Sequence, residues 1–99
     1  MQFTFVFESK EGQNLSYLMC FIPCPVWKKG SNEIINLHPE FPHFKIGDIK
    51  SLIEKENLND IKKVALVIHN VGHASKEDLR NILTELEGLN ISYSINTLR

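Results

Sequence analysis

The sequence predicts an α/β fold, α+β-like in character, in which a mixed sheet of four or five strands carries two helices on one face. Two observations lead to this fold class. Two apolar segments with strand periodicity, joined by a glycine-containing turn, are typical of an antiparallel hairpin. Further along, an apolar strand, an amphipathic helix and another strand are typical of a parallel βαβ unit. We expect the 99 residues to form a single domain, 1–99.

The N-terminal hairpin is predicted from residues 2–8 and 15–22. Phe3, Phe5 and Phe7 recur at every second position, so their rings lie on one face of a strand with a buried side. The second segment, LSYLMCFI, is apolar at nearly every position, which indicates an internal strand antiparallel to the first. This hairpin must join the main sheet, because its phenylalanine side chains need a core to cover them.

Prolines divide the middle of the chain. Pro23 and Pro25 end or bend the second strand, because proline has no N–H to donate to a neighbouring strand. The sequence KKGSN then predicts a turn, and EIINL, residues 33–37, predicts a short third strand. The next segment, HPEFPHF, is expected to be an extended loop because it contains two further prolines.

A helix and a central strand follow this loop. Within residues 46–57, apolar side chains form the stripe of an amphipathic helix at Ile46, Ile49, Leu52 and Ile53. Residues 62–69, KKVALVIH, contain a continuous run of five apolar side chains. Continuous rather than alternating apolarity predicts a central strand that is covered on both faces.

The last helix and strand have the clearest patterns. Ser75 is suited to the N-cap position of a helix, and Gly88 is suited to its left-handed C-terminal end. The apolar stripe of this helix consists of Leu79, Ile82, Leu83 and Leu86. The final segment, ISYSINTL, alternates apolar and polar side chains, which predicts an edge strand or a partly open sheet face. The predicted order is therefore strand, strand, short strand, helix, strand, helix and strand.

Composition and charge exclude several classes of function. The chain has 11 Lys and Arg residues against 12 Asp and Glu residues, and a net charge of −1. This balance disfavours non-specific binding to nucleic acid, which depends on a basic surface. No apolar run approaches the roughly 18 residues that cross a bilayer, and the first residues, MQFTFVFESKEGQ, do not resemble a signal peptide. We therefore expect a cytoplasmic protein with no membrane partner and with reduced cysteines.

Two cysteines and two histidines follow the spacing C-x3-C-x13-H-x4-H, which is close to that of a zinc finger. A DNA-binding finger carries its histidines on a helix, and two prolines between these histidines exclude that helix. A non-helical zinc site is the weaker alternative to free thiols and exposed histidines, so we expect no metal and no cofactor. The four residues of this alternative are Cys20, Cys24, His38 and His43.

The turn between the central strand and the last helix is a candidate ligand site. Ligands of open α/β sheets bind where strands end, and the free N–H groups of a helix N-terminus favour anions such as phosphate. The competing interpretation is a tight turn that needs Gly72 for its backbone freedom alone. The candidate ligand-binding residues are His69, Asn70, His73, Ser75 and Lys76.

A second candidate site lies in the proline-rich segment FIPCPVWKKG. Trp27 stands beside Lys28 and Lys29, and an aromatic side chain next to charges is common in protein interfaces. An equally weighted interpretation is that Trp27 covers the hydrophobic core.

The sequence lacks the glycine-rich and nucleophile motifs of common enzymes, which disfavours catalysis without excluding it. We therefore expect a small binding protein, such as an inhibitor or an immunity protein of the anti-defence type, that associates non-covalently with a partner protein. The alternative is a binder or hydrolase of a small phosphorylated ligand, such as a nucleotide or cyclic oligonucleotide, at the turn 69–76.

Overall fold

The computed structural model describes residues 2–21, 25–30, 33–36, 43–69, 72 and 75–98. Within these residues the chain forms one mixed sheet of six strands and two helices, which confirms the predicted fold class but adds to the expected four or five strands. In chain order the elements are β1 (Gln2–Ser9), β2 (Asn14–Phe21), β3 (Pro25–Lys29), β4 (Glu33–Ile35), α1 (Asp48–Lys55), β5 (Ile61–His69), α2 (Lys76–Gly88) and β6 (Ser92–Leu98).

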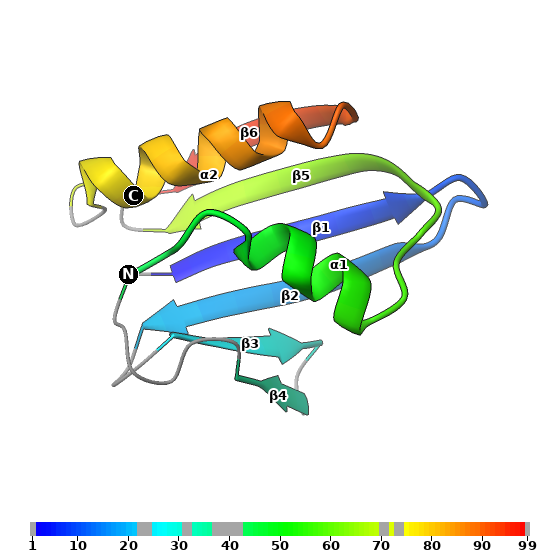
Figure 1. Ribbon diagram of the computed structural model, residues 1–99, viewed down its shortest axis with the longest axis horizontal. Helices are drawn as coiled ribbons and strands as arrows, with labels where there is room; N and C mark the ends of the chain where they lie inside the picture. The colour runs from blue at the N-terminus through cyan, green and yellow to red at the C-terminus, as the bar shows by residue number, and fades with distance from the viewer. Residues whose placement is uncertain are drawn as a thin grey trace.

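The sheet has the strand order β4-β3-β2-β1-β5-β6. The predicted hairpin is confirmed as the antiparallel pair of β1 and β2, and the predicted βαβ unit as the parallel pair of β5 and β6 joined through α2. The two units meet where β1 pairs antiparallel with β5. Both helices lie on the same face of the sheet, as expected (Figure 1).

The additional strand is β3, where the sequence suggested only a bend and a turn. Pro25 is the first residue of β3 and lies opposite Phe21 of β2, at a strand end where a proline is tolerated. The turn predicted at KKGSN is present at Gly30, which has a φ of 58°, although Lys28 and Lys29 of that segment belong to β3. The strand was missed because it presents a single large side chain, Trp27, to the core between a proline and two lysines.

The hydrophobic core lies between the sheet and the two helices. Phe3, Phe5 and Phe7 are at most 1% exposed, as the strand periodicity predicts. The Phe5 ring centroid lies 5.0 Å from that of Trp27, and the Phe7 ring centroid 5.7 Å from that of Tyr17 in an edge-to-face arrangement. Full burial of each such side chain stabilises the fold by about 1.5–3 kcal/mol. The helices complete this core with Ile49, Leu52, Ile82 and Leu86.

The opposite face of the sheet carries no helix among the described residues (Figure 1). Along β5 the exposure alternates: Val64, Leu66 and Ile68 are buried under the helices, whereas Ala65 and Val67 on the other face are only half-buried. The prediction that this strand is covered on both faces is therefore wrong. Small aliphatic residues on the helix-free face produced the continuous apolar run.

The helices begin and end close to the predicted positions. The Ser75 hydroxyl oxygen accepts the Asp78 backbone N–H at 3.4 Å, so Ser75 is the N-cap of α2, as expected. Gly88, however, is the last helical residue, and Asn90 takes the left-handed conformation with a φ of 57°. Ile46 precedes α1 and is 65% exposed, so it is not part of the buried stripe. Neither described helix is long and apolar enough to cross a membrane.

Candidate functional site

The most extensive candidate surface is the helix-free side of the sheet, here called the open sheet face. It consists of the alternate residues of each strand whose side chains point away from α1 and α2. The strand register places Leu18, Thr4 and Val67 side by side in one row of this face. A second row contains Ser16, Val6, Ala65 and Ser94.

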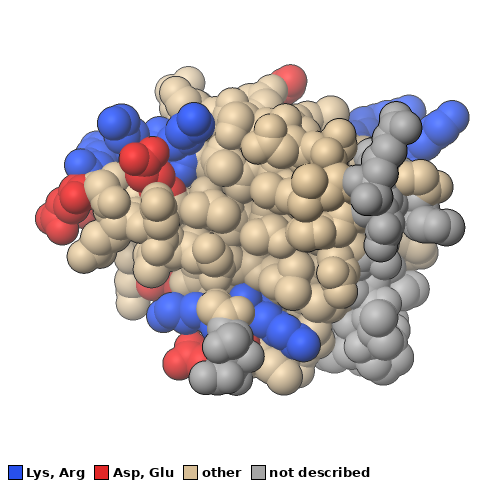
Figure 2. All heavy atoms as spheres, turned by 180° about the vertical axis from the view of Figure 1, so that it is seen from behind, with Lys and Arg blue, Asp and Glu red and all other residues tan. Residues whose placement is uncertain are grey.

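The middle of the open sheet face is uncharged. Figure 2 shows this side of the molecule, with uncharged residues across the middle and lysine, arginine and carboxylate side chains toward the margins. The charged residues that the register assigns to this face are Glu8, Lys28 and Lys63. Directly opposite side chains on a sheet lie about 4.5–5.5 Å apart. Because side chains on neighbouring strands lie this close, each covers part of the next. The central aliphatic side chains are therefore half-buried, but a partner can still contact them from the helix-free side.

His69 lies on the open sheet face at the end of β5. Its Nε2 atom is 2.9 Å from the Thr4 hydroxyl oxygen, and the direction of this hydrogen bond depends on the imidazole tautomer. Ser75 caps α2, and Lys76 is exposed on the first turn of that helix. The described part of the predicted ligand site therefore holds a histidine and a serine that both have intramolecular partners. Asn70 and His73 lie outside the described residues.

Trp27, Lys28 and Lys29 do not form a common patch. The Trp27 ring is fully buried in the core beside Phe5, as the core-covering interpretation expects. Lys28 points to the open sheet face, whereas Lys29 points to the helix side, where its Nζ lies 3.8 Å from Glu56 Oε2. Alternation along β3 separates the two lysines, so an aromatic anchor flanked by charges is not presented to a partner here.

The described members of the zinc alternative lie on opposite sides of the sheet. Cys20 is a buried free thiol on the open sheet face, whereas His43 lies beside α2, with its Nδ1 3.6 Å from Asp78 Oδ2. Cys24 and His38 lie outside the described residues. Among the residues that the structure describes, no group of three or more His, Cys, Asp or Glu side chains could hold a metal ion.

Two buried carboxylates on α2 were not identified from the sequence. Asp78 Oδ1 accepts the backbone N–H of Phe44 at 2.9 Å. Glu85 accepts two more, from Gly47 at 3.0 Å and from Lys50 at 2.8 Å. These carboxylates hold the segment that leads into α1. The sequence did contain one indication that these acids are buried. They are seven residues apart and therefore share the helix face that carries Ile82.

Burial determines how these two carboxyl groups titrate. Desolvation raises the pKa of Glu85, and the N–H groups of Lys50 and Gly47 oppose this shift by stabilising the charged form. Desolvation also raises the pKa of Asp78, against the opposing effects of the Phe44 N–H and of His43. Both groups are engaged with backbone donors, which indicates a structural role rather than acid–base catalysis.

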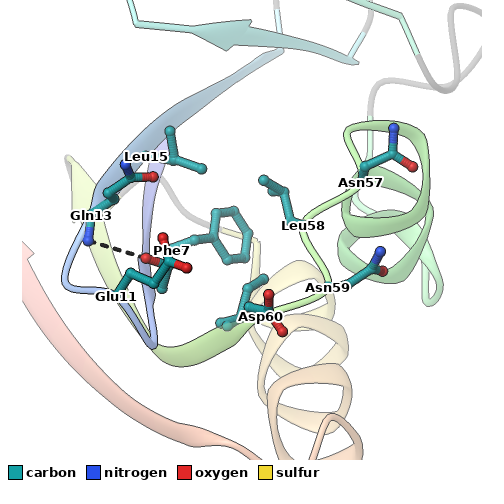
Figure 3. Close-up of a pocket in the computed structure, with 10 residues that line it drawn as sticks. Phe7, Glu11, Gln13, Leu15, Asn57, Leu58, Asn59 and Asp60 are labelled. Carbon is teal, nitrogen blue, oxygen red and sulfur yellow. Dashed lines mark hydrogen bonds between the residues drawn. The ribbon is translucent and has the colours of Figure 1, made fainter.

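A small pocket lies at the other end of the sheet from His69. It has a volume of about 240 Å³, below the roughly 300 Å³ at which most ligand pockets begin. Figure 3 shows the side chains of Phe7 and Leu58 pointing toward one another across it, with polar side chains around the rim. The rim residues are Ser9, Glu11, Gln13, Asn57, Asn59 and Asp60. This composition suits a small ligand with hydrogen-bond donors but contains no basic residue for a phosphate.

Comparisons of the chain with models of protein families, with curated proteins and with solved structures found no match.

Proposed function

We propose that the protein is a small cytoplasmic binding protein that associates non-covalently with a partner protein through the open sheet face. An inhibitor or immunity protein is the concrete form of this proposal. The observation that carries it is the uncharged aliphatic centre around Leu18, Val6 and Val67, on the side of the sheet without a helix among the described residues.

The distribution of side chains on this face resembles that of a protein interface. Interfaces bring an apolar, charge-depleted centre together with a polar rim that remains hydrated. Here the half-buried Leu18 and Val67 form the centre, and Lys28 and Lys63 lie toward the rim. Desolvation of the centre is inexpensive because its side chains carry no charge.

The sheet also holds this surface in one conformation. Val6 lies on β1, which has a paired strand on each side, and Leu18 and Val67 lie on strands that are likewise paired on both sides. A partner that docks here does not have to order the backbone, so little conformational entropy opposes binding. The engagement of His69 with Thr4, and of Asp78 and Glu85 with backbone N–H groups, fits a binding protein better than an acid–base catalyst.

The experiment changes the centre of the open sheet face and compares it with a matched position on the helix side. Leu18→Glu and Val67→Glu each place a charge in the centre, whereas Ile46→Glu places one at an exposed apolar residue on the helix side. Wild type and variants are used to capture proteins from an extract of the expressing cells. Any captured protein is then purified, and its affinity for each variant is measured by calorimetry.

We expect Leu18→Glu and Val67→Glu to weaken binding at least tenfold, because a buried unpaired charge costs more than about 1.4 kcal/mol. Ile46→Glu should bind as wild type does. Melting temperatures of all three variants confirm that they remain folded. Equal binding by wild type and both sheet variants would assign the interaction to another surface, and the absence of any captured protein would contradict the proposal.

A further inference from the structure

The strand β6 forms one edge of the sheet and pairs only with β5 among the described residues. It is seven residues long, Ser92–Leu98, and its register with β5 shows no irregularity. Six of these seven residues are exposed. The outer side of this strand therefore presents backbone N–H and C=O groups that can pair with another extended chain.

This edge lacks the features by which proteins prevent strand pairing. Charged side chains, prolines and bulges usually interrupt exposed edges, and the segment SYSINTL contains no charge and no proline. The opposite edge, β4, differs because it is only three residues long and contains Glu33. The two edges of one sheet are thus unequal, and β6 is the one suited to pairing.

Exposed apolar side chains line the helix side of the same edge. Tyr93 is 36% exposed and Ile95 38% exposed, and the register places both on the face that carries the helices. Leu83 of α2 is also 38% exposed. Helical periodicity puts Leu83 on the flank of α2 opposite Asp78 and Glu85, which face α1. Leu83 therefore lies on the β6 side of that helix (Figure 1).

We propose that β6 pairs with β6 of a second copy of this chain, antiparallel and with Ile95 on the two-fold axis. In this register Tyr93 of each copy lies opposite Thr97 of the other. The polar residues Ser94 and Asn96 face one another on the other side of the strand. The two sheets then form one continuous sheet, and the Leu83 side chains flank the junction above the helix-side face.

The lack of charge on β6 favours a second copy of this chain as the strand that pairs with it. The occupant must be an extended strand, because the unpaired groups of β6 are backbone groups. A two-fold arrangement places identical residues near the axis, where like charges would repel. Since β6 carries no charge, it meets its own copy without repulsion. Aromatic and β-branched side chains such as Tyr93 and Thr97 also form favourable cross-strand pairs.

Sedimentation equilibrium of the purified full chain tests this pairing. Wild type should reach twice the 11.4 kDa mass of one chain as its concentration is raised. The range from about 1 μM to about 1 mM covers the affinities of weak and moderate dimers. Ile95→Lys places two like charges opposite one another on the axis, so the dimer dissociation constant should rise at least tenfold. Ile95→Glu should have the same effect.

A charge-swap mixture makes the test specific for this register. Equal amounts of Ile95→Lys and Ile95→Glu should regain the dimer mass, because Lys and Glu then face one another. Ile34→Lys, on the opposite edge strand β4 and 61% exposed, is the matched control and should remain dimeric. Thermal melting confirms that each variant is folded.

Three results would overturn the pairing: a wild-type monomer at the highest concentration, loss of the dimer in Ile34→Lys instead of Ile95→Lys, or a mixture that stays monomeric. The readout is the mass of purified protein and involves no partner protein. The pairing of β6 can therefore be disproved while binding through the open sheet face holds, and binding through the open sheet face can be disproved while the pairing holds.

Discussion

The Glu85 carboxylate of α2 accepts the backbone N–H of Lys50 of α1 at 2.8 Å, so one helix supplies an N-terminal cap for the other. A second bond, from Gly47 N–H at 3.0 Å, uses the other carboxylate oxygen. The first N–H groups of any helix lack partners within the helix, and a side chain of the same segment usually satisfies one of them. Here the cap comes from a residue far along the chain, so it also fixes the position of α1 relative to α2.

Replacement of Glu85 by Gln tests this tertiary cap. The amide can accept only through its oxygen and presents an N–H₂ group to the second backbone donor. We expect the free energy of unfolding to fall by about 1–3 kcal/mol, since hydrogen bonds to a charged acceptor contribute about this much. Urea unfolding measures the change. Glu87→Gln, exposed on the same helix, is the control and should stay within about 0.5 kcal/mol of wild type.

The buried carboxyls Asp78 and Glu85 predict a specific dependence of stability on pH. Burial raises the pKa of both groups in the folded protein, so the folded state binds their protons more tightly than the unfolded state does. Their contribution to the free energy of unfolding should therefore be largest below about pH 4 and fall as the pH rises through the raised pKa values. Urea midpoints measured across this range should show the decline.

Asp78→Asn isolates one of these groups, because it removes the titration while preserving the size of the side chain. The decline with pH should be shallower in Asp78→Asn than in wild type. Glu87→Gln, at an exposed position of the same helix, should keep the wild-type slope. An Asp78→Asn curve parallel to the wild-type curve would show that Asp78 does not contribute to it.

Tyr17 carries a buried hydroxyl with no hydrogen-bond partner among the described residues. Burial, with the nearby charges of Glu56 and Glu33, raises the pKa of Tyr17 to about 12. Because an unpaired hydroxyl is costly to bury, Tyr17→Phe should leave the free energy of unfolding unchanged or raise it by about 1 kcal/mol. Wild type should also lose stability as the pH rises from about 10 toward 12, and Tyr17→Phe should lack that part of the loss. A Tyr17→Phe variant less stable than wild type at pH 7 would contradict this account.

The hydrogen bond between Thr4 and His69 joins β1 to β5 on the open sheet face. Thr4→Val keeps the β-branched shape and removes the hydroxyl. We expect the free energy of unfolding to fall by about 0.5–1.5 kcal/mol, the usual contribution of one such bond. Thermal unfolding measures the change. Thr97→Val, at an exposed position of β6, is the comparison and should shift the thermal midpoint less than Thr4→Val does.

Local periodicity predicted most of the fold. The alternation of Phe3, Phe5 and Phe7 identified β1 and its buried face, and the alternating segment at the end of the chain indicated the edge position of β6. β3 was missed, because strand pairing with β2 rather than a local pattern determines it. The second apolar face of β5 was misread, since a row of Ala and Val does not reveal whether a helix covers it.

The open sheet face and the long-range contacts of the buried carboxylates were harder to predict, because both depend on residues that are distant in the sequence. Asp78 accepts a hydrogen bond from a residue 34 positions away and Glu85 from one 38 positions away. The seven-residue spacing of the two acids shows that they share a helix face, but it does not show which backbone groups they bind. Trp27 could be read as either core or interface until its burial was known. The open sheet face depends on the placement of both helices, which alternation in single strands does not specify.

The order of the strands has a consequence for how the chain reaches this structure. β1 to β4 follow one another as a meander of neighbours, so their contacts form between residues close in the sequence. β1 must also pair with β5, which is distant in the sequence: Thr4 hydrogen-bonds to His69, 65 positions away. Such long-range closure is slow because a large loop must be ordered first. We therefore expect docking of the C-terminal half onto β1 to limit the folding rate, and the phenylalanine row of β1 to stay open to aggregation until that docking is complete.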